Sequence, residues 1–211
     1  MNGHVGKGDE GADTMVVQQS APADQVRPVL APQEGGQNLP RTAFRALAIL
    51  RIAVGAIFLW AFLDKAFGLQ YATPSERSWI NGGSPAGGYL GSVSLGPMES
   101  TYHTWAGEVW VDWLYMAGML GLGVSLVAGI GLRVTALAGP LMMLFLWLGE
   151  FPPARHASDG SPTMSPNPLV DQHVIYAVVM VVLALCSADR VWGLGRLWAR
   201  LPVISRYRWL Q

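Results

Sequence analysis

The chain has 211 residues, of which 51% are hydrophobic and 13% are charged, and its 14 Lys and Arg residues balance 14 Asp and Glu residues. Soluble domains carry about 25% charged residues, so this composition indicates a membrane protein, and the lack of a basic excess argues against a nucleic-acid partner. The single cysteine, Cys186, excludes an intramolecular disulfide, a CxxC redox pair and an all-cysteine metal or iron–sulfur site.

Hydropathy divides the chain into a polar start, an apolar centre and a basic end. Residues 1–43 are rich in Gly, Ala, Pro, Gln and Asp and contain no long apolar run, which predicts a disordered tail. A helix needs roughly 20 apolar residues to cross a hydrocarbon layer of about 30 Å. Four segments approach this length, at about 44–63, 113–132, 134–149 and 168–188. We therefore predict an all-α integral membrane protein in which residues 44–188 form a four-transmembrane-helix bundle.

The connections between these helices differ greatly in length. Only Leu132 and Arg133 separate the second and third helices, which predicts a tight helical hairpin. The first and second helices are joined by residues 64–112, and loops longer than about 15 residues are usually functional or disordered. This loop contains the glycine-rich string "WINGGSPAGGYLG", followed by Trp and Val residues at helical spacing between 105 and 110. We expect it to form a long outer loop that caps the bundle.

The distribution of Lys and Arg predicts the orientation of the bundle in the membrane. Arginines precede the first helix, lie in the turn between the second and third helices, and follow the fourth helix (Arg41, Arg45, Arg133, Arg190, Arg196, Arg200, Arg206 and Arg208). The loops on the other side carry only Lys65, Arg77 and Arg155. By the positive-inside rule, both termini are predicted to be cytoplasmic. We also expect the membrane to be a plasma membrane of the prokaryotic type. Residues 189–211 interleave arginine with tryptophan and leucine, which predicts a basic amphipathic tail in contact with membrane lipid.

Two further patterns concern the faces of the helices. Arg51 lies about two turns inside the first helix, where an unpaired charge costs at least about 2.5 kcal/mol. It either snorkels or pins two helices, with Asp189 as a candidate partner, or it contributes to a ligand pocket. On the second helix, small residues recur every four positions and predict close packing against another helix (Ala117, Gly121, Ser125 and Gly129).

Ionisable and aromatic side chains gather where the predicted topology places the outer ends of the helices. Trp60 and Asp64 share one face of the first helix, beside Lys65, and Glu150 ends the third helix. Such residues are either interfacial anchors or parts of a site, since ionisable groups at membrane depth are expensive. The topology therefore predicts one outer site formed by Asp64, Lys65, Glu150 and two residues of the fourth helix, Asp171 and His173.

The fourth helix opens with the string "NPLVDQHVIY". Asn167 is a suitable N-cap and Pro168 a suitable first helical residue. The negative charge of Asp171 near the N-terminus interacts favourably with the helix dipole. His173 has Tyr176 one turn later on the same side, and it either caps or packs the helix or relays a proton to a ligand such as a quinone carbonyl.

Several cofactors are not expected. A haem held by two histidines needs a facing pair inside the bundle, whereas His4, His103 and His156 fall in predicted tails or loops. The chain also has no GxGxxG, P-loop or HExxH motif. We therefore predict no haem, metal or flavin, and expect any redox chemistry to use a diffusible carrier or a partner protein.

The strings "RIAVGAIFLWAFLDKAFGLQYAT", "WINGGSP..GYL" and "NPLVDQHVIYA" resemble the DoxX-like membrane protein family, and most closely its DoxD branch, over residues 44–190. The resemblance implies a four-helix membrane subunit of a thiosulfate:quinone oxidoreductase. With a second protein subunit, such a protein oxidises thiosulfate to tetrathionate and passes the electrons to membrane quinone.

This resemblance implies roles for the residues named above. His173, assisted by Asp171 or Asp64, would manage the protons as quinone becomes quinol, and a small anionic substrate would approach Lys65 and Arg77. The wider pocket would include Arg51, Trp60, Trp79, Glu150 and Tyr176. The alternative is a non-catalytic membrane scaffold or accessory subunit of a redox or respiratory complex, which the long outer loop and the basic tail suit equally well.

Overall fold

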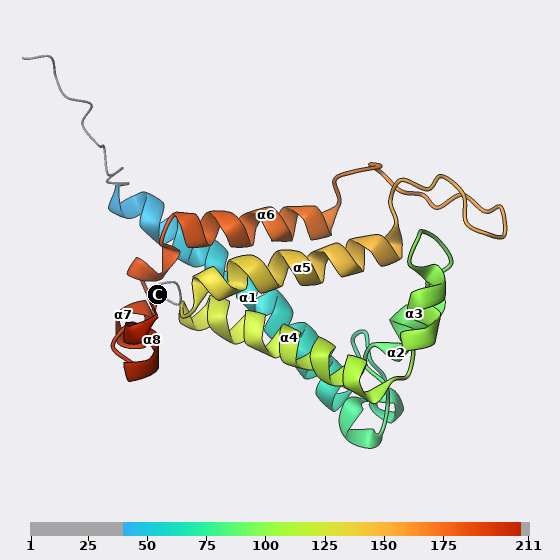
Figure 1. Ribbon diagram of the computed structural model, residues 1–211, viewed down its shortest axis with the longest axis horizontal. Coiled ribbons are helices and arrows are strands. Elements are labelled where there is room, and N and C mark those ends of the chain that lie inside the picture. Colours follow the sequence, from blue (N-terminus) through green and yellow to red (C-terminus); the bar gives the residue numbers. More distant parts are fainter. Residues whose placement is uncertain (1–39, 208–211) are drawn as a thin grey trace, which may run out of the picture. The chain divides into compact units, whose positions relative to one another are not determined.

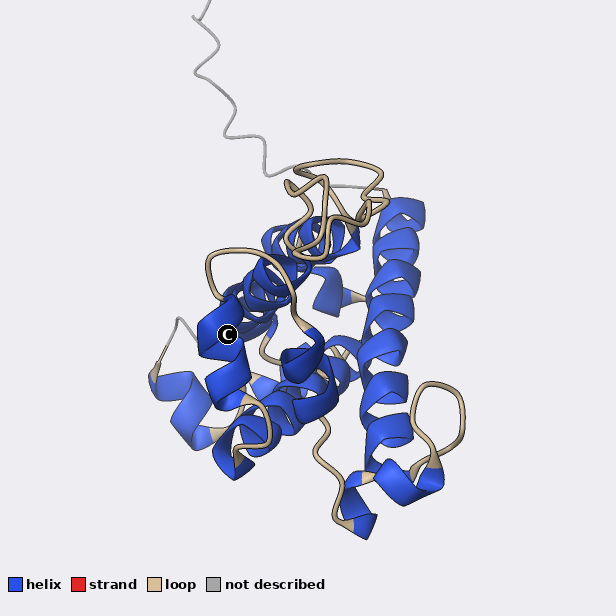
Figure 2. Cartoon of the chain, turned by 90° about the vertical axis from the view of Figure 1, so that its right-hand side faces the viewer, coloured by secondary structure: helices blue, strands red, loops and turns tan. Residues whose placement is uncertain are grey.

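The computed structural model describes residues 40–207, and this part of the chain is helical (Figure 1). Within it there is no β-strand, only an isolated bridge between His156 and Pro162, which confirms the all-α prediction for these residues. The predicted tail 1–43 lies outside the described residues, except for its last four positions, where the first helix begins. Figure 2 shows long helices joined by loops and short helical turns.

Three helices are long and apolar enough to cross a membrane: α1 (Arg41–Phe67), α4 (Val109–Ala128) and α5 (Leu132–Glu150). A fourth apolar helix, α6 (Gln172–Leu185), has 14 residues. At about 1.5 Å per residue it is about 21 Å long, less than the hydrocarbon layer it was predicted to span.

The start of α6 corrects the predicted N-cap. Asn167 accepts hydrogen bonds from the amides of Leu169 and Val170, both at 2.9 Å, but this turn does not continue into a helix. The helix begins instead after Asp171, whose side chain accepts from the amides of His173 and Val174. Both residue types are good caps, and the sequence alone does not decide between them.

The long helices form two close pairs, α1 with α4 and α5 with α6. A Cβ atom at Gly55 would lie 2.8 Å from the backbone nitrogen of Val127, and one at Gly123 would lie 2.8 Å from that of Leu59. In the second pair, a Cβ at Gly139 would meet the end of the Met180 side chain, which can move. The backbones of α1 and α4 therefore approach so closely that a methyl group does not fit at their contact.

The first half of the predicted small-residue stripe on α4 does not pack, whereas its last member, Gly129, is buried against Arg51 of α1. Ala117 and Gly121 are exposed, and a Cβ at Gly121 would meet no atom within 4 Å. The contact with α1 is made by Gly123 and its neighbours because the helix is rotated relative to the stripe. Inside the pairs lies an apolar core to which all four long helices contribute (Val54, Phe58, Leu122, Leu126, Leu132, Met143, Met180, Leu183 and Ala188).

Residues 68–108 connect α1 to α4 and contain four short helices: η1 (Ser75–Arg77), η2 (Trp79–Asn81), α2 (Gly87–Ser92) and α3 (Glu99–Trp105). The buried carboxylate of Asp112 accepts hydrogen bonds from the hydroxyl of Ser84 at 2.9 Å and the amide of Ala86 at 2.8 Å. The hydroxyl of Tyr102 donates to the carbonyl of Phe145 in α5 at 2.7 Å. These bonds attach the segment to α4 and α5.

Arg51 is fully buried and joins α1 to two other parts of the chain. Its guanidinium donates to the carbonyls of Leu126 and Val127 at the end of α4, and to that of Trp192 at 2.8 Å. A left-handed glycine, Gly129, ends α4 here, and a Cβ on it would lie 2.5 Å from the guanidinium. The structure thus supports the interpretation that this arginine pins helices.

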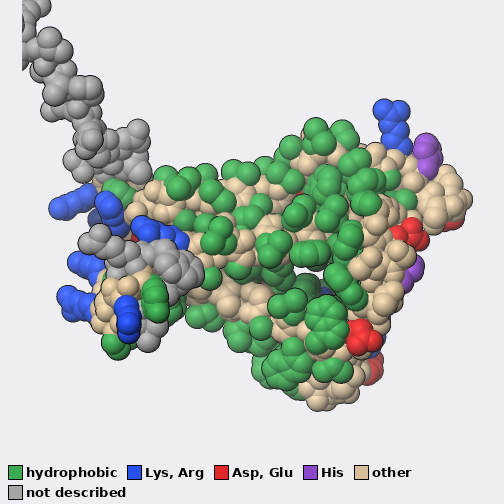
Figure 3. Space-filling model, in the orientation of Figure 1, with side chains coloured by type: hydrophobic (Ala, Val, Ile, Leu, Met, Phe, Trp, Pro, Cys, Tyr) green, Lys and Arg blue, Asp and Glu red, His purple; other side chains and the backbone are tan. Residues whose placement is uncertain are grey.

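Beyond Arg51 the chain continues through η3 (Ala188–Arg190), α7 (Gly195–Trp198) and α8 (Pro202–Arg206). The amide of Leu194 donates to the carbonyl of Ala128 at 2.8 Å, next to the arginine contacts. Exposed arginines gather at this end, whereas acidic and histidine side chains gather mostly at the other (Figure 3).

The helix contact at Gly123 predicts a selective effect of an added methyl group. Gly123→Ala should lower the free energy of unfolding by about 1–3 kcal/mol, because the methyl group has no space against the Leu59 backbone. Gly121→Ala, two positions away on the same helix, meets no atom and should raise it by up to about 1 kcal/mol, because alanine is the better helix former. Thermal unfolding of the two variants in detergent measures this difference, and equal effects would contradict the packing described here.

The contacts of Arg51 predict that its loss loosens the C-terminal segment. Arg51→Met leaves buried carbonyls unsatisfied, at about 1–3 kcal/mol each, and should speed tryptic cleavage after Arg190 and Arg196. Arg45→Met removes an exposed arginine from the same helix and serves as the control. If the two variants are cleaved at the same rate, the anchoring role is wrong.

Candidate functional site

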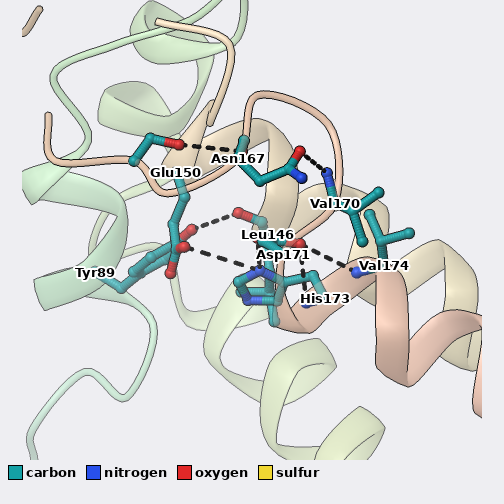
Figure 4. A network of polar contacts seen from close by, with 9 residues as sticks. Tyr89, Leu146, Glu150, Asn167, Val170, Asp171, His173 and Val174 are labelled. Atoms are coloured by element: carbon teal, nitrogen blue, oxygen red, sulfur yellow. Dashed lines mark hydrogen bonds and ion pairs between the residues drawn. The ribbon is translucent and has the colours of Figure 1, made fainter. Parts of the chain in front are cut away.

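The strongest cluster of ionisable side chains lies where α5 ends and α6 begins (Figure 4). One carboxylate oxygen of Asp171 accepts the amides of His173 at 3.0 Å and Val174 at 3.1 Å, which starts the helix. The other oxygen lies 2.7 Å from Nδ1 of the His173 ring. Glu150, the last residue of α5, places a carboxylate oxygen 3.9 Å from the same nitrogen. These three side chains therefore meet around one atom.

The bonds of Asp171 determine where the proton of His173 lies. The carboxylate of Asp171 accepts hydrogen bonds from two backbone amides and from the His173 ring, and these bonds favour its ionised form. An ionised carboxylate only accepts hydrogen bonds, so Nδ1 of His173 is the donor. The neutral ring then presents Nε2, on its other edge, as an acceptor.

Tyr89 of α2 reaches the same cluster from the connecting segment. Its hydroxyl donates to the carbonyl of Leu146 at 2.8 Å and packs so closely on Gly149 that a Cβ there would lie 2.5 Å away. Burial raises the pKa of Tyr89, and the negative charges of Glu150 and Asp171 raise it further. Within the described residues, no lysine or arginine forms an ion pair with either carboxylate. The cluster therefore has excess negative charge.

Beside the cluster, an open groove of about 330 Å³ runs between α5 and α6. Its walls are almost entirely apolar, and His173 is the one ionisable residue among those that line it (Pro140, Met143, Leu144, Trp147, Leu169, His173, Val174, Ala177 and Val178). His173 lines this groove, and Nε2 is the ring nitrogen that does not contact the two carboxylates. A ligand in the groove could exchange a proton or a hydrogen bond with Nε2.

The residues predicted at the end of α1 line a different groove, of about 460 Å³, which shares no lining residue with the first. Trp60 and Lys65 lie there, and the ring of Trp60 meets that of Tyr71 edge to face at 5.0 Å. The buried carboxylate of Asp64 accepts the amides of Tyr71 at 3.2 Å and Ala72 at 3.0 Å, so it closes the turn after α1. The predicted single outer site is thus divided in two, because α1 pairs with α4 whereas α5 pairs with α6.

Three other predicted residues lie elsewhere. Arg51 is held by carbonyls at the far end of α4. Trp79 packs edge to face on Trp113 at 4.6 Å, and Tyr176 does the same on Phe58 of α1 at 6.1 Å. None of the three lines either groove. Their observed contacts are those of packing and anchoring residues.

Two residues that build or adjoin the site, Trp147 and Tyr89, were not predicted as site residues. Trp147 lines the groove one turn before Glu150, and this spacing could have pointed to it. Its ring nitrogen is buried without a hydrogen-bond partner. Tyr89 gave no local signal, because its hydroxyl bonds the carbonyl of Leu146, which is far away in the sequence.

A scan against protein-family models and searches of curated proteins and of solved structures found no match to this chain.

The double role of Asp171 predicts that its two functions can be separated. Asp171→Ala removes the cap and should lower the free energy of unfolding by about 0.5–2 kcal/mol. Asp171→Asn keeps an oxygen for the two amides and should stay within about 0.5 kcal/mol of the wild type, but it replaces the acceptor of the His173 ring with an amide. Thermal unfolding tests the first expectation and the NMR shifts of the ring nitrogens test the second. An unchanged His173 spectrum in both variants would contradict the assigned ring orientation.

Proposed function

We propose that this chain is an integral membrane protein of the DoxX-like type that serves as the quinone-linked subunit of an oxidoreductase, with thiosulfate as the electron donor. α6 is then the fourth helix of the bundle. It lies along α5, and exposed apolar residues before it, Leu169 and Val170, extend its short apolar length. The concentration of exposed arginines at the end that carries α7 and α8 supports a cytoplasmic location for both termini.

The observation that carries this proposal is the groove between α5 and α6, with His173 at its end. A quinone has an apolar tail and a polar ring with two carbonyl oxygens. The apolar walls suit the tail, and the ring edge of His173 offers the single polar contact. Exposed apolar residues flank the groove on both helices, so a molecule dissolved in lipid would reach it directly (Leu141, Leu144, Ile175 and Val178).

The proposed reaction assigns a proton role to this chain. Two thiosulfate ions joined as tetrathionate release two electrons, and a quinone that takes them up also takes up two protons to become a quinol. His173 would donate a proton from Nε2 to a quinone oxygen, and Asp171 would stabilise the ring while it is charged. The half-exposed Glu150 connects this ring to water.

The second groove supplies a place for the anionic substrate. Lys65 lines it, and Arg77 in η1 is exposed. The positive charges would attract a dianion such as thiosulfate, with Trp60 as the apolar wall. A second protein subunit would carry the electrons between the substrate and the quinone.

The scaffold alternative is favoured by one observation, a set of large apolar side chains that are more than half exposed at the start of α4 (Val109, Trp110, Trp113 and Leu114). These residues would contact either lipid or a partner. Co-purification of a stoichiometric partner, together with no labelling of the chain by a photoreactive quinone, would favour the scaffold.

The proposed proton role predicts a large effect of removing the imidazole. In membranes that contain this chain and its co-purifying partner, His173→Ala should lower thiosulfate-dependent quinone reduction by roughly 100-fold or more, because a positioned acid or base contributes about 10²–10⁴-fold. His103→Ala is the control, since His103 hydrogen-bonds the carbonyl of Val93 and lines neither groove. Equal activity of the two variants would refute the assignment.

A further inference from the structure

We propose that Glu150, Asp171 and His173 bind a divalent transition-metal ion, for which Zn²⁺ is the best match. This site goes beyond the proposed function and does not depend on it. The metal would be held at Nδ1 of His173, on the edge of the ring that faces away from the groove.

The arrangement of the three ligand atoms supports this site. One nitrogen and two carboxylate oxygens, one from each residue, lie within 4.8 Å of one another. Zn²⁺ bonds of about 2.0–2.2 Å place neighbouring ligand atoms of a tetrahedral site roughly 3.3 Å apart. The observed distances from Nδ1, 2.7 Å to Asp171 and 3.9 Å to Glu150, lie on either side of this value. The two carboxylate oxygens lie at most 4.8 Å apart, so the half-exposed Glu150 would have to move toward the other two ligands to close the site.

The three side chains differ in how far they are exposed to solvent, and this difference suits a binding site. The side chain of His173 is only 9% exposed and that of Asp171 11%, so the structure fixes both before an ion arrives. Glu150 is 44% exposed and can move from water onto the ion. A fourth coordination position remains for water, as in sites of zinc that are not purely structural.

Charge supplies the driving force for binding a cation. Two carboxylates lie beside one imidazole, and within residues 40–207 neither has a lysine or arginine ion-pair partner. A dication would compensate both negative charges. Asp171 would give the ion only the oxygen that now contacts His173, and its other oxygen would keep the two amides that start α6.

The ligand set selects among metals. Imidazole together with carboxylate suits Zn²⁺, whereas Mg²⁺ prefers an octahedral shell of oxygen atoms. We therefore expect Zn²⁺ to bind and Mg²⁺ to bind far more weakly.

Binding would change the groove through the tautomer of His173. Without metal, the proton of the neutral ring lies on Nδ1, where it faces Asp171. Zn²⁺ on Nδ1 requires that this proton leave, and the neutral ring then carries its proton on Nε2. The nitrogen at the groove would change from a hydrogen-bond acceptor into a donor. The metal would thus regulate which ligand groups the groove accepts.

The site is tested by titrating the purified full-length chain in detergent with ZnCl₂ and, separately, with MgCl₂ in a calorimeter. We expect one Zn²⁺ per chain, binding at least tenfold weaker in Glu150→Gln and in His173→Ala, and binding of Mg²⁺ at least tenfold weaker than that of Zn²⁺. Glu150→Gln changes a half-exposed side chain, so it keeps the test valid if His173→Ala does not fold. His156→Ala, an exposed histidine in the loop between α5 and α6, is the control and should bind Zn²⁺ as the wild type does.

Three results would overturn the site: no Zn²⁺ binding at concentrations up to about 1 mM, equal affinity of the wild type and Glu150→Gln, or equal affinity for Zn²⁺ and Mg²⁺. X-ray absorption of the Zn²⁺-loaded chain should show nitrogen and oxygen ligands at about 2.0–2.2 Å that include an imidazole. A spectrum without an imidazole ligand would also overturn the site. These measurements contain no quinone, so their outcome tests the metal site alone. The proposed function is tested separately by the quinone-reduction assay.

Discussion

The carboxylate of Asp171 is the interaction on which the candidate site depends. One of its oxygens accepts two backbone amides and so determines where α6 begins, and the other holds the ring of His173. One carboxylate therefore determines both the start of the helix and the orientation of the imidazole. The side chain of Glu150 then approaches this ring because α5 ends beside the beginning of α6.

The polar side chains of this apolar bundle differ in whether they find their partners within the chain or in water. The guanidinium of Arg51 donates to several carbonyls, and the carboxylates of Asp64 and Asp112 each accept two hydrogen bonds. These bonds hold segments of the chain together, although Nε of Arg51 is buried without a hydrogen-bond partner. Glu150 differs, because its contact with His173 at 3.9 Å is too long for a hydrogen bond and its side chain is half-exposed. Access to water distinguishes Glu150 from the buried anchors.

The sequence predicted the helices well where their apolar pattern is long, and poorly where the outcome depends on rotation or on distant segments. Hydropathy indicated α1, α4 and α5, and Arg51 was recognised as a residue that either pins helices or lines a pocket. It could not show that α4 presents Gly123 rather than Gly121 to α1, because a helix with small residues on several faces has no preferred side. For the same reason, residues at one end of the bundle were predicted to form one site, although α1 and α5 belong to different helix pairs. The position of Tyr89 could not be predicted from the sequence, because it depends on a contact with Gly149, 60 positions further along the chain.

His173 lies between two environments, and this position connects the groove to the carboxylates. One edge of its ring lines a groove whose walls are apolar and open toward the exposed faces of α5 and α6. The other edge faces two carboxylates, of which Glu150 is in contact with water. A proton or a metal ion that reaches the second edge changes the hydrogen-bonding character of the first, because the two ring nitrogens share one proton in the neutral form. A single aromatic ring can therefore transmit a charge event in water to a ligand in an apolar groove without any movement of the helices, and this requires only that Asp171 keep the ring in place.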